Sequence, residues 1–408
     1  MAQAGLRGER GKALLLENIH SDAAWVLHDA GYEVERVEKS LAHDDLVERL
    51  AGVRLLGIRS NTTLTEAAFD AAPDLIAVGA FCIGTNQIDL AAASSRGVAV
   101  FNAPFSNTRS VVELAIAEII ALTRRLTDKN ADMHAGRWDK SAVGSHEIRG
   151  RRLGIVGYGN IGSQLSVLAE ALGMSVLFYD TADKLALGNA RRCGTLNELL
   201  AESDVVTLHV DGRSGNSGLF GEEQFARMRP GSIFLNLSRG FVVDHEALRR
   251  HIESGHVAGA AVDVFPVEPK GRGEEFRSRL RGLPNVILTP HVGGSTEEAQ
   301  QDIGNFVAGK LRDYDLEGTT SLSVNLPPAA LPRAEGTSRL LHLHHNTPGV
   351  LATINGLLAD SGLNIEGQVL GTRGHLGCVV TDVAGGAAHD LVEALRRRPE
   401  TVRLRVLG

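Results

Sequence analysis

The chain has 408 residues, and at about 150 residues per domain this length predicts two or three domains. Hydrophobic residues make up 43% of the chain and charged residues 22%, which argues against a disordered or fibrous protein. The net charge of −7 argues against a nucleic-acid partner, because phosphate backbones bind basic surfaces. The three cysteines are far apart and have no metal-ligand spacing, so we expect neither a disulfide framework nor a metal site.

Nothing in the sequence predicts a membrane span or a signal peptide. The longest apolar stretch, Val111–Thr123, is interrupted by Glu113 and Glu118, which favours a packed helix. Residues 1–12 are polar and basic, and only the short apolar run 13–16 follows them. We therefore expect a cytoplasmic protein with no membrane partner.

Strand and helix patterns alternate from the start of the chain. Apolar runs predict strands at 13–16, 32–37, 55–58, 75–78 and 98–101, with helices between them. A helix predicted at 110–124 separates this series from a second one, with strands at 153–156, 175–179, 205–209, 232–236, 258–263 and 286–289. Alternation of this kind predicts two doubly wound α/β domains with parallel sheets, Rossmann- or flavodoxin-like.

The C-terminal part predicts a different architecture. A further helix is predicted at 296–314, and the stretch 326–336 has three prolines, which is typical of a linker. Beyond the linker, the patterns predict strand, helix, strand, strand, helix and strand between residues 339 and 407. This βαββαβ order is that of a ferredoxin-like domain.

The strongest local motif is Gly157-Tyr158-Gly159-Asn160-Ile161-Gly162, directly after a predicted strand and at the start of a helix. In this motif Gly157 allows a tight turn, Gly159 lets a pyrophosphate approach the backbone, and Gly162 lets helix and strand pack closely. The N-terminus of the following helix offers free N–H groups to the phosphates. The pattern predicts a dinucleotide site.

Asp180 ends the next predicted strand, eighteen residues after Gly162. A carboxylate at this position accepts hydrogen bonds from a ribose diol and repels a 2′-phosphate. Since the next residue is Thr181 and not arginine, the sequence favours NAD over NADP as the cofactor.

Three charged or titratable residues follow predicted strands of the second series: Arg239, Glu268 and His291. Open α/β sheets bind ligands at the carboxyl ends of their strands. An arginine can bind a carboxylate and polarise a carbonyl, while a histidine oriented by a glutamate can exchange the hydroxyl proton. Each residue alone has an ordinary structural explanation, but the ordered set predicts oxidation of a hydroxy acid.

With these motifs in place, the chain resembles the D-isomer-specific 2-hydroxyacid dehydrogenase family, and within it the enzymes that act on D-3-phosphoglycerate. The stretches 82–87, 101–111 and 289–300 carry the resemblance beyond the motifs above. It implies NAD-dependent oxidation of D-3-phosphoglycerate to 3-phosphohydroxypyruvate, the first step of L-serine biosynthesis. Reduction of 2-oxoglutarate is an implied side activity.

The resemblance also implies roles for individual residues. Arg239 and Glu268 are the assisting residues and His291 is the proton donor. The residues implied to contact NAD are Gly157, Gly159, Asn160, Ile161, Gly162, Asp180, Leu237, Ser238, Asp263, Val292, Gly293 and Gly294. The residues implied to contact the substrate are Arg59, Ser60 and Asn107. Asn61 departs from relatives that have a second basic residue there, which puts the strength of phosphate binding in doubt.

The family implies three domains and an oligomer. The substrate-binding domain is expected at 1–105 and 295–330, the NAD-binding domain at 106–294, and an ACT regulatory domain at 337–408. In the ACT domain, His344, Asn346 and Asn364 are implied to bind the inhibitor L-serine between two copies of the domain. Trp138 is implied to insert into a neighbouring subunit, and the resemblance favours a homotetramer.

Three other interpretations stay open. The chain can be a dehydrogenase of another, unphosphorylated D-2-hydroxy acid. It can be an NAD-responsive binding protein similar to transcriptional corepressors, because such relatives can retain the Arg/Glu/His set. The ACT domain can serve assembly alone, without an effector.

Overall fold

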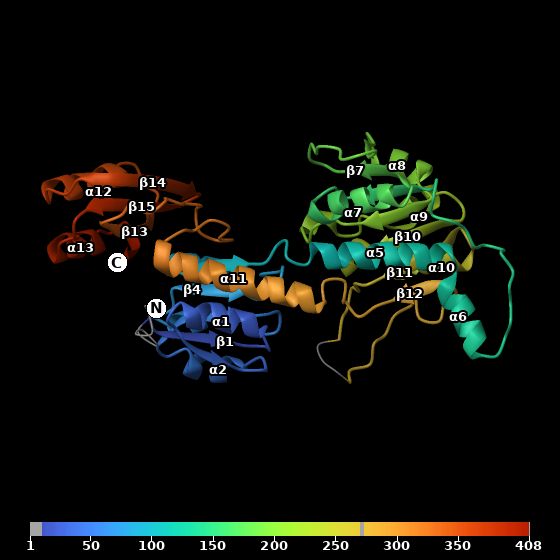
Figure 1. Ribbon diagram of the computed structural model, residues 1–408, viewed down its shortest axis with the longest axis horizontal. Helices are drawn as coiled ribbons and strands as arrows, with labels where there is room; N and C mark the ends of the chain where they lie inside the picture. The colour runs from blue at the N-terminus through green and yellow to red at the C-terminus, as the bar shows by residue number, and fades with distance from the viewer. Residues whose placement is uncertain (1–9, 270–272, 408) are drawn as a thin grey trace, which may run out of the picture. The chain divides into compact units, whose positions relative to one another are not determined.

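The computed structural model describes residues 10–269 and 273–407, and the predicted domain ends at 1–9 and 408 lie outside this range. The chain divides into two compact units (Figure 1). One unit comprises the described residues up to Ser106 together with those from Gln300 onward, and the other comprises Asn107–Ala299. No helix within the described residues is long and apolar enough to cross a membrane.

The first unit contains a five-stranded parallel sheet in the order β2-β1-β3-β4-β5. This is the flavodoxin-like order, in which the chain direction across the sheet reverses beside β1. Helices cover both faces, so every strand except the edge strand β2 is almost entirely buried. The strands are β1 (Lys12–Leu15), β2 (Glu33–Arg36), β3 (Val53–Ile58), β4 (Ala77–Ala80) and β5 (Ala99–Asn102). The helices are α1 (Ser21–Asp29), α2 (His43–Arg49), α3 (Glu66–Asp70), α4 (Leu90–Ser95) and, from Gln300 onward, α11 (Glu297–Glu317).

The fourth strand lies two residues later than its prediction at 75–78. Leu75 and Ile76 are buried, but they precede the strand, which pairs with β3 from Ala77 onward. The apolar run predicts burial correctly. The register depends on pairing with the neighbouring strand, and glycine and alanine have a low intrinsic preference for strands.

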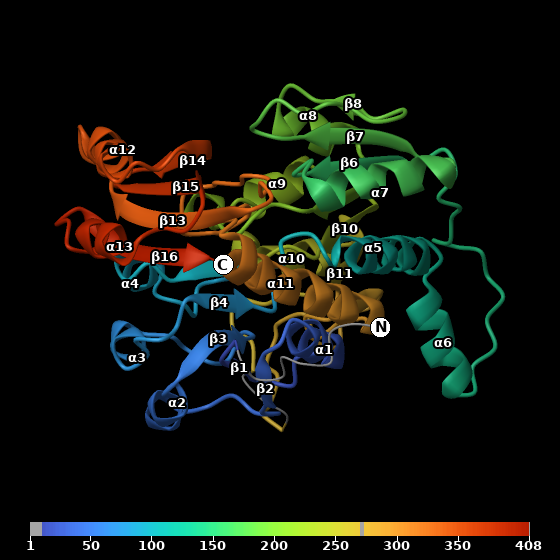
Figure 2. The same ribbon diagram turned by 60° about the vertical axis from the view of Figure 1, so that its left-hand side comes forward.

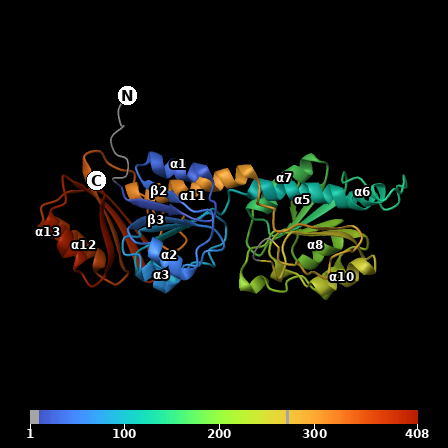
Figure 3. The same cartoon turned by 90° about the horizontal axis from the view of Figure 1, so that it is seen from below.

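The second unit contains a seven-stranded sheet in the order β12-β11-β10-β9-β6-β7-β8, in which every pairing is parallel. Helices lie on both faces, α5 and α7 on one and α8 and α10 on the other (Figure 3). The strands are β6 (Arg152–Val156), β7 (Ser175–Tyr179), β8 (Arg191–Arg192), β9 (Val205–Leu208), β10 (Ser232–Asn236), β11 (Val257–Val262) and β12 (Val286–Leu288). The helices are α5 (Thr108–Thr123), α6 (Leu126–His134), α7 (Asn160–Ala171), α8 (Leu196–Glu202), α9 (Glu222–Arg227) and α10 (His245–Glu253). This arrangement confirms the prediction of two doubly wound domains.

The sequence analysis does not predict α6. None of its residues is buried, and Leu126 and Met133 are exposed, so it has no apolar face toward a core. Periodicity predicts a helix only where one face is buried. The segment after α6 includes Trp138, which is 74% exposed.

The C-terminal part forms a four-stranded antiparallel sheet in the order β14-β15-β13-β16. Its elements are β13 (Thr337–His345), α12 (Val350–Asp360), β14 (Ile365–Arg373), β15 (Leu376–Ala384), α13 (His389–Arg396) and β16 (Thr401–Leu407). Both helices lie on the same side of the sheet (Figure 2). The observed βαββαβ order confirms the ferredoxin-like prediction.

Candidate active site

The glycine motif forms the turn between β6 and α7, the point where the strand order of the second unit reverses. Gly157 has a φ of +94°, and a Cβ there would lie 2.6 Å from the carbonyl oxygen of His209. A Cβ on Gly162 would lie 2.3 Å from the carbonyl oxygen of Gly157. At Gly159, by contrast, a Cβ would meet nothing within 4 Å. The turn thus fits a dinucleotide, since its glycines give close packing at two positions and open space at the third.

Asn160 and Ile161 are the first two residues of α7. Because the first N–H groups of a helix have no partners within it, their backbone suits the binding of a pyrophosphate. The helix is 12 residues long, and Gly162 on its inner side is buried.

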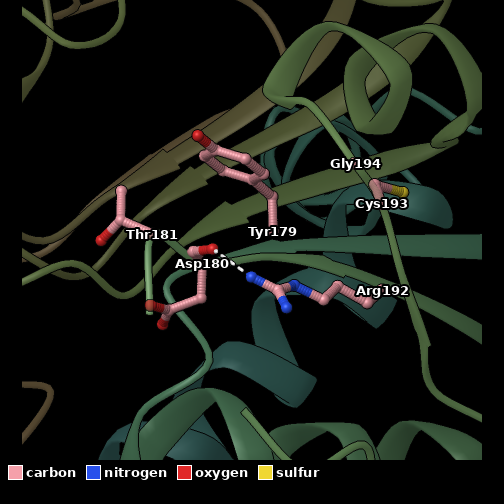
Figure 4. A pocket seen from close by; sticks show the side chains of 6 residues that line it. All are labelled: Tyr179, Asp180, Thr181, Arg192, Cys193 and Gly194. Atoms are coloured by element: carbon pink, nitrogen blue, oxygen red, sulfur yellow. Dashed lines mark hydrogen bonds between the residues drawn. The ribbon is translucent and has the colours of Figure 1, made fainter. Parts of the chain in front are cut away.

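Asp180 follows β7, and two backbone N–H groups orient its carboxylate. The N–H of Tyr158 donates to Oδ2 at 2.8 Å, and that of Ala182 donates to Oδ1 at 2.8 Å. Together with Tyr179, Thr181, Arg192, Cys193 and Gly194, Asp180 lines a pocket of about 370 Å³ (Figure 4). A carboxylate in this position suits the ribose diol of NAD.

No sequence pattern predicts Arg192 in this pocket. Its guanidinium donates to the backbone oxygens of Asp180 and Ala182, at 3.3 and 3.2 Å, and pairs with Asp183. Arg192 lies in β8, a strand of two residues that is too short to give a periodic pattern in the sequence. Arg192 therefore helps to close the loop that begins at Asp180.

Arg239 follows β10 in a turn held by Asn236. The side-chain oxygen of Asn236 accepts hydrogen bonds from the N–H and hydroxyl of Ser238, at 3.1 and 2.8 Å. Leu237 and Ser238 are buried, while the guanidinium of Arg239 donates to the carbonyl oxygen of Ser238 at 2.7 Å. The turn presents a cation at the carboxyl end of the strand.

Glu268 and His291 form a pair in the same unit. The Nδ1 atom of His291 lies 2.9 Å from Oε2 of Glu268, and the other oxygen of Glu268 accepts the N–H of Phe265 at 3.0 Å. The His291 side chain is 50% exposed. With Nδ1 bound to the carboxylate, Nε2 is the atom available to exchange a proton with a ligand.

The turn that carries His291 is held by Asp263. His291 has a φ of +54°, a region that residues other than glycine rarely adopt. Its N–H donates to the carbonyl oxygen of Asp263 at 2.9 Å. The carboxylate of Asp263 accepts the hydroxyl of Thr289 and the N–H groups of Val292 and Gly293. The predicted NAD contacts Asp263, Val292 and Gly293 therefore belong to one hydrogen-bonded cluster around the histidine.

Asn107 and Gly294 lie next to each other in this unit. A Cβ on Gly294 would lie 2.1 Å from the side-chain nitrogen of Asn107. Asn107 is the residue before α5 and the first residue of the second unit. It is thus found in the unit of His291, whereas Arg59 and Ser60 belong to the first unit.

The pair has the electrostatics of a general acid and base. The hydrogen bond to Glu268 raises the pKa of His291. Burial lowers this pKa, and the negative charges of Glu268 and Asp263 raise it further. Burial alone would raise the pKa of Glu268, but the hydrogen bond from His291 and the N–H of Phe265 hold it below its usual value. The pKa of each partner is thus shifted in favour of its charged form, the imidazolium of His291 and the carboxylate of Glu268.

Arg59 and Ser60 follow β3 in the first unit, where the carboxyl ends of parallel strands meet. Glu17 accepts the backbone N–H of Arg59, and Gln87 donates to the backbone oxygen of Arg59 at 2.6 Å. The sequence analysis does not predict either contact, because both residues lie far from Arg59 along the chain.

In the C-terminal domain, His344 is 2% exposed and Asn346 and Asn364 are exposed. The Nδ1 atom of His344 pairs with the backbone oxygen of His345 at 2.9 Å, and its Nε2 atom is buried without a partner. Asn364 donates to Glu366 at 3.0 Å. In the described part of the chain, no hydrogen bond joins these three residues to one another.

The sequence of the chain also matches two family models and several known proteins. The family model for the NAD binding domain of D-isomer specific 2-hydroxyacid dehydrogenases matches residues 116–293, and a model for an AHAS small subunit-like ACT domain matches residues 340–403. A D-3-phosphoglycerate dehydrogenase of Haemophilus influenzae is 51% identical over 397 residues, which cover 97% of each chain. The chain belongs to the D-3-phosphoglycerate dehydrogenase family.

Further relatives agree with this membership. The family member of Escherichia coli K12 is 47% identical over the full length of both chains. A solved D-lactate dehydrogenase of Aquifex aeolicus, complexed with NAD and lactic acid, is 25% identical with a TM-score of 0.63. That match covers 74% of this chain and 95% of the other. The protein is therefore an NAD-dependent oxidoreductase that acts on a CH–OH group, with an ACT domain at its C-terminal end.

Replacing Glu268 by glutamine should move the pH dependence of the reaction to lower pH. A base that accepts the hydroxyl proton of an alcohol must be neutral, so with His291 in this predicted role kcat/KM rises with pH through the raised pKa of this histidine. Loss of the carboxylate lowers that pKa, because the partner that favours the imidazolium is gone. The acid limb of kcat/KM, measured between pH 5 and 10 in the oxidation direction, should therefore shift downward.

The chain offers a matched control for this prediction. His251 and Glu222 form a second histidine–carboxylate pair with the same separation of 2.9 Å, on α10 and α9. Glu222→Gln should leave the pH profile of the reaction unchanged. An acid limb that stays in place or rises in Glu268→Gln would contradict the role of Glu268.

Proposed function

We propose that the protein oxidises the 2-hydroxyl of D-3-phosphoglycerate to give 3-phosphohydroxypyruvate with NAD, the first step of L-serine biosynthesis. The observation that carries the chemistry is the pair of His291 and Glu268, 2.9 Å apart, in the same unit as Arg239. The substrate is supported by relatives of that name that are 46–51% identical to this chain.

In the proposed reaction, His291 accepts the proton of the C2 hydroxyl at Nε2 while the C2–H bond breaks and the C=O bond forms. Bound NAD would supply the acceptor for the hydride from C2. Glu268 orients the imidazole through Nδ1 and stabilises its charged form. Arg239 binds the carboxylate of the substrate and polarises the developing carbonyl. The alcohol thus loses one proton, to His291, and one hydride, to the cofactor.

The other site residues have proposed binding roles. Arg59, Ser60 and Asn107 bind the polar groups of the substrate. Asp180 binds the ribose diol, which favours NAD over NADP. The residues of the turns after β6, β10 and β12, and Asp263 after β11, hold the remainder of the cofactor: Gly157, Gly159, Asn160, Ile161, Gly162, Leu237, Ser238, Asp263, Val292, Gly293 and Gly294. The proposed domains are 1–105 with 295–330 for the substrate, 106–294 for NAD, and 337–408 for regulation.

L-Serine is the proposed effector of the ACT domain. We assign its binding to His344, Asn346 and Asn364, contributed by two copies of the domain. The exposure of both asparagines and the unpartnered Nε2 of His344 support this assignment, because amide and imidazole groups suit a zwitterionic ligand. An oligomer, with a tetramer as the proposed state, is supported by the exposed side chain of Trp138.

The proposal is tested by NADH formation from NAD and D-3-phosphoglycerate, with and without L-serine. We expect turnover of about 1 per second or more, as for ordinary enzymes, and suppression of turnover by serine. Asn346→Ala should relieve the suppression without loss of basal activity. Asn355→Ala is the matched control, since Asn355 lies in the same domain and is paired with Gln368.

Each outcome of this assay has a definite meaning. Turnover that serine does not affect would support the proposed reaction but contradict serine binding by the ACT domain, whose role would then be assembly alone. A panel of D-lactate, D-2-hydroxyglutarate and other D-2-hydroxy acids identifies an unphosphorylated substrate, and NADH oxidation by 2-oxoglutarate tests the side activity. NAD binding without turnover of any of these acids would favour a corepressor-like binding protein.

A further inference from the structure

Glu17 is a buried carboxylate that binds the backbone of the loop carrying Arg59 and Ser60. Glu17 is 6% exposed. One carboxylate oxygen accepts the N–H groups of Arg59, at 3.1 Å, and Thr62, at 2.8 Å, and the other accepts the N–H of Asn61 at 3.0 Å. Three backbone donors of a four-residue loop thus converge on one side chain.

The topology of the sheet explains why Glu17 lies beside the loop 59–62. β1 and β3 are neighbours, so the segments that follow them lie at the same edge. Glu17 lies two residues after β1, and Arg59 lies directly after β3. The backbone of Glu17 has a φ of +60° and that of Asn18 a φ of +51°. Strained backbone of this kind persists where the surroundings hold it in place, and it concentrates at functional sites.

The distribution of charge is unusual for a buried carboxylate, which is most often paired with a cation. Glu17 forms no ion pair within residues 10–269 and 273–407, and its negative charge is stabilised by backbone N–H groups instead. The guanidinium of Arg59 has neither a hydrogen bond nor an ion pair to any described residue. The loop is therefore held without use of the arginine side chain, which stays available to an anionic ligand.

We propose that Glu17 is a positioning residue for the substrate: it holds the loop 59–62 in the conformation in which Arg59 and Ser60 bind an anionic group of the substrate. Gln87 supports the same conformation by donating a hydrogen bond to the backbone oxygen of Arg59. This inference rests on the proposed function, in which Arg59 and Ser60 bind D-3-phosphoglycerate.

The test is a Glu17→Gln variant of the full chain. One oxygen remains as acceptor for Arg59 and Thr62, but the new NH₂ group faces the N–H of Asn61, so the loop is held less well. We expect the KM for D-3-phosphoglycerate to rise about tenfold, the effect of one lost charge-assisted hydrogen bond. The kcat should change by less than about twofold, because the loop is proposed to bind the substrate and not to take part in the chemical step. The Kd for NADH, measured by fluorescence, should also change by less than about twofold, because the loop has no proposed contact with the cofactor.

Glu38→Gln is the control, because Glu38 is an exposed carboxylate in the same part of the chain. Its KM should equal that of the wild type. If Glu17→Gln does not fold, Glu17→Asp, which keeps the charge but shortens the side chain by one methylene, has the same expected effect on KM.

Arg59→Gln, alone and combined with Glu17→Gln, separates the possible failures. We expect Arg59→Gln to raise KM, and the double variant to have the KM of Arg59→Gln within about twofold, because residues that act through one another are not additive. A raised KM in Arg59→Gln with an unchanged KM in Glu17→Gln overturns this inference alone. A double variant whose rise in KM equals the product of the two single rises overturns it as well. An unchanged KM in Arg59→Gln overturns the substrate role of the loop, and this inference with it.

Discussion

Replacing His291 by glutamine should lower kcat by about a thousandfold, within the range of a general acid–base contribution. Glutamine is similar in size and can still donate to Glu268, but it cannot accept the hydroxyl proton at neutral pH. The His291 ring is half exposed and its turn is held by backbone and Asp263 contacts, so the fold should persist. Stopped-flow and steady-state measurement of NADH formation gives the rate.

The binding of the cofactor should be unaffected by this substitution. We expect the Kd for NADH to stay within about twofold of the wild-type value, since the role proposed for His291 is the exchange of a proton and not the binding of the cofactor. His251→Gln is the matched control, because His251 also pairs with a glutamate at 2.9 Å but lies on α10. A kcat in His291→Gln close to that of this control would exclude His291 as the proton-exchanging residue.

Replacing Arg239 by glutamine should lower kcat/KM by a factor on the order of a thousand, comparable to the loss of a donor that stabilises developing negative charge. The guanidinium can bind a carboxylate with two parallel hydrogen bonds, and glutamine offers one neutral donor group. Arg239→Lys should recover only part of the loss, because the ammonium keeps the charge but lacks the fork geometry.

The measurement is kcat/KM for D-3-phosphoglycerate, with circular dichroism as the check on folding. Arg227→Gln is the control, since Arg227 pairs with Glu223 on the surface of α9 and has no role in the proposed reaction. If Arg239→Lys matched the wild type, positive charge alone would explain the role of this residue, and two-point binding of the carboxylate would be wrong.

Much of the fold follows from local pattern. The strands at 175–179 and 232–236 agree with β7 and β10 residue for residue, because both are short apolar runs in a sheet covered on both faces. The hydrophobic pattern does not predict α6, because this helix has no buried face, or β8, because this strand has only two residues. The pattern predicts the fourth strand two residues too early, because the position of β4 depends on its pairing with the neighbouring strand.

The candidate site divides in the same way. The sequence predicts Gly157, Asp180, Arg239, Glu268 and His291, because each has a motif or the end of a predicted strand beside it. The hydrogen-bonded pair of Glu268 and His291 is also an expectation that the observed distance of 2.9 Å fits.

The residues that hold these groups in place have no such signal. Asp263 binds the turn of His291 across more than twenty residues, and Glu17 binds the loop of Arg59 across more than forty. Both contacts join segments that meet only because parallel strands end at the same edge of a sheet.

The sequence by itself determined the layer architecture, the order of elements and the chemical groups of the site, because periodicity, glycine turns and charged residues at strand ends are local properties. Only the tertiary structure decided which buried carboxylates hold the loops of Arg59 and His291, and how Arg192 helps to close the loop that begins at Asp180. Those facts depend on the lateral order and register of strands, which result from packing between segments distant in the chain.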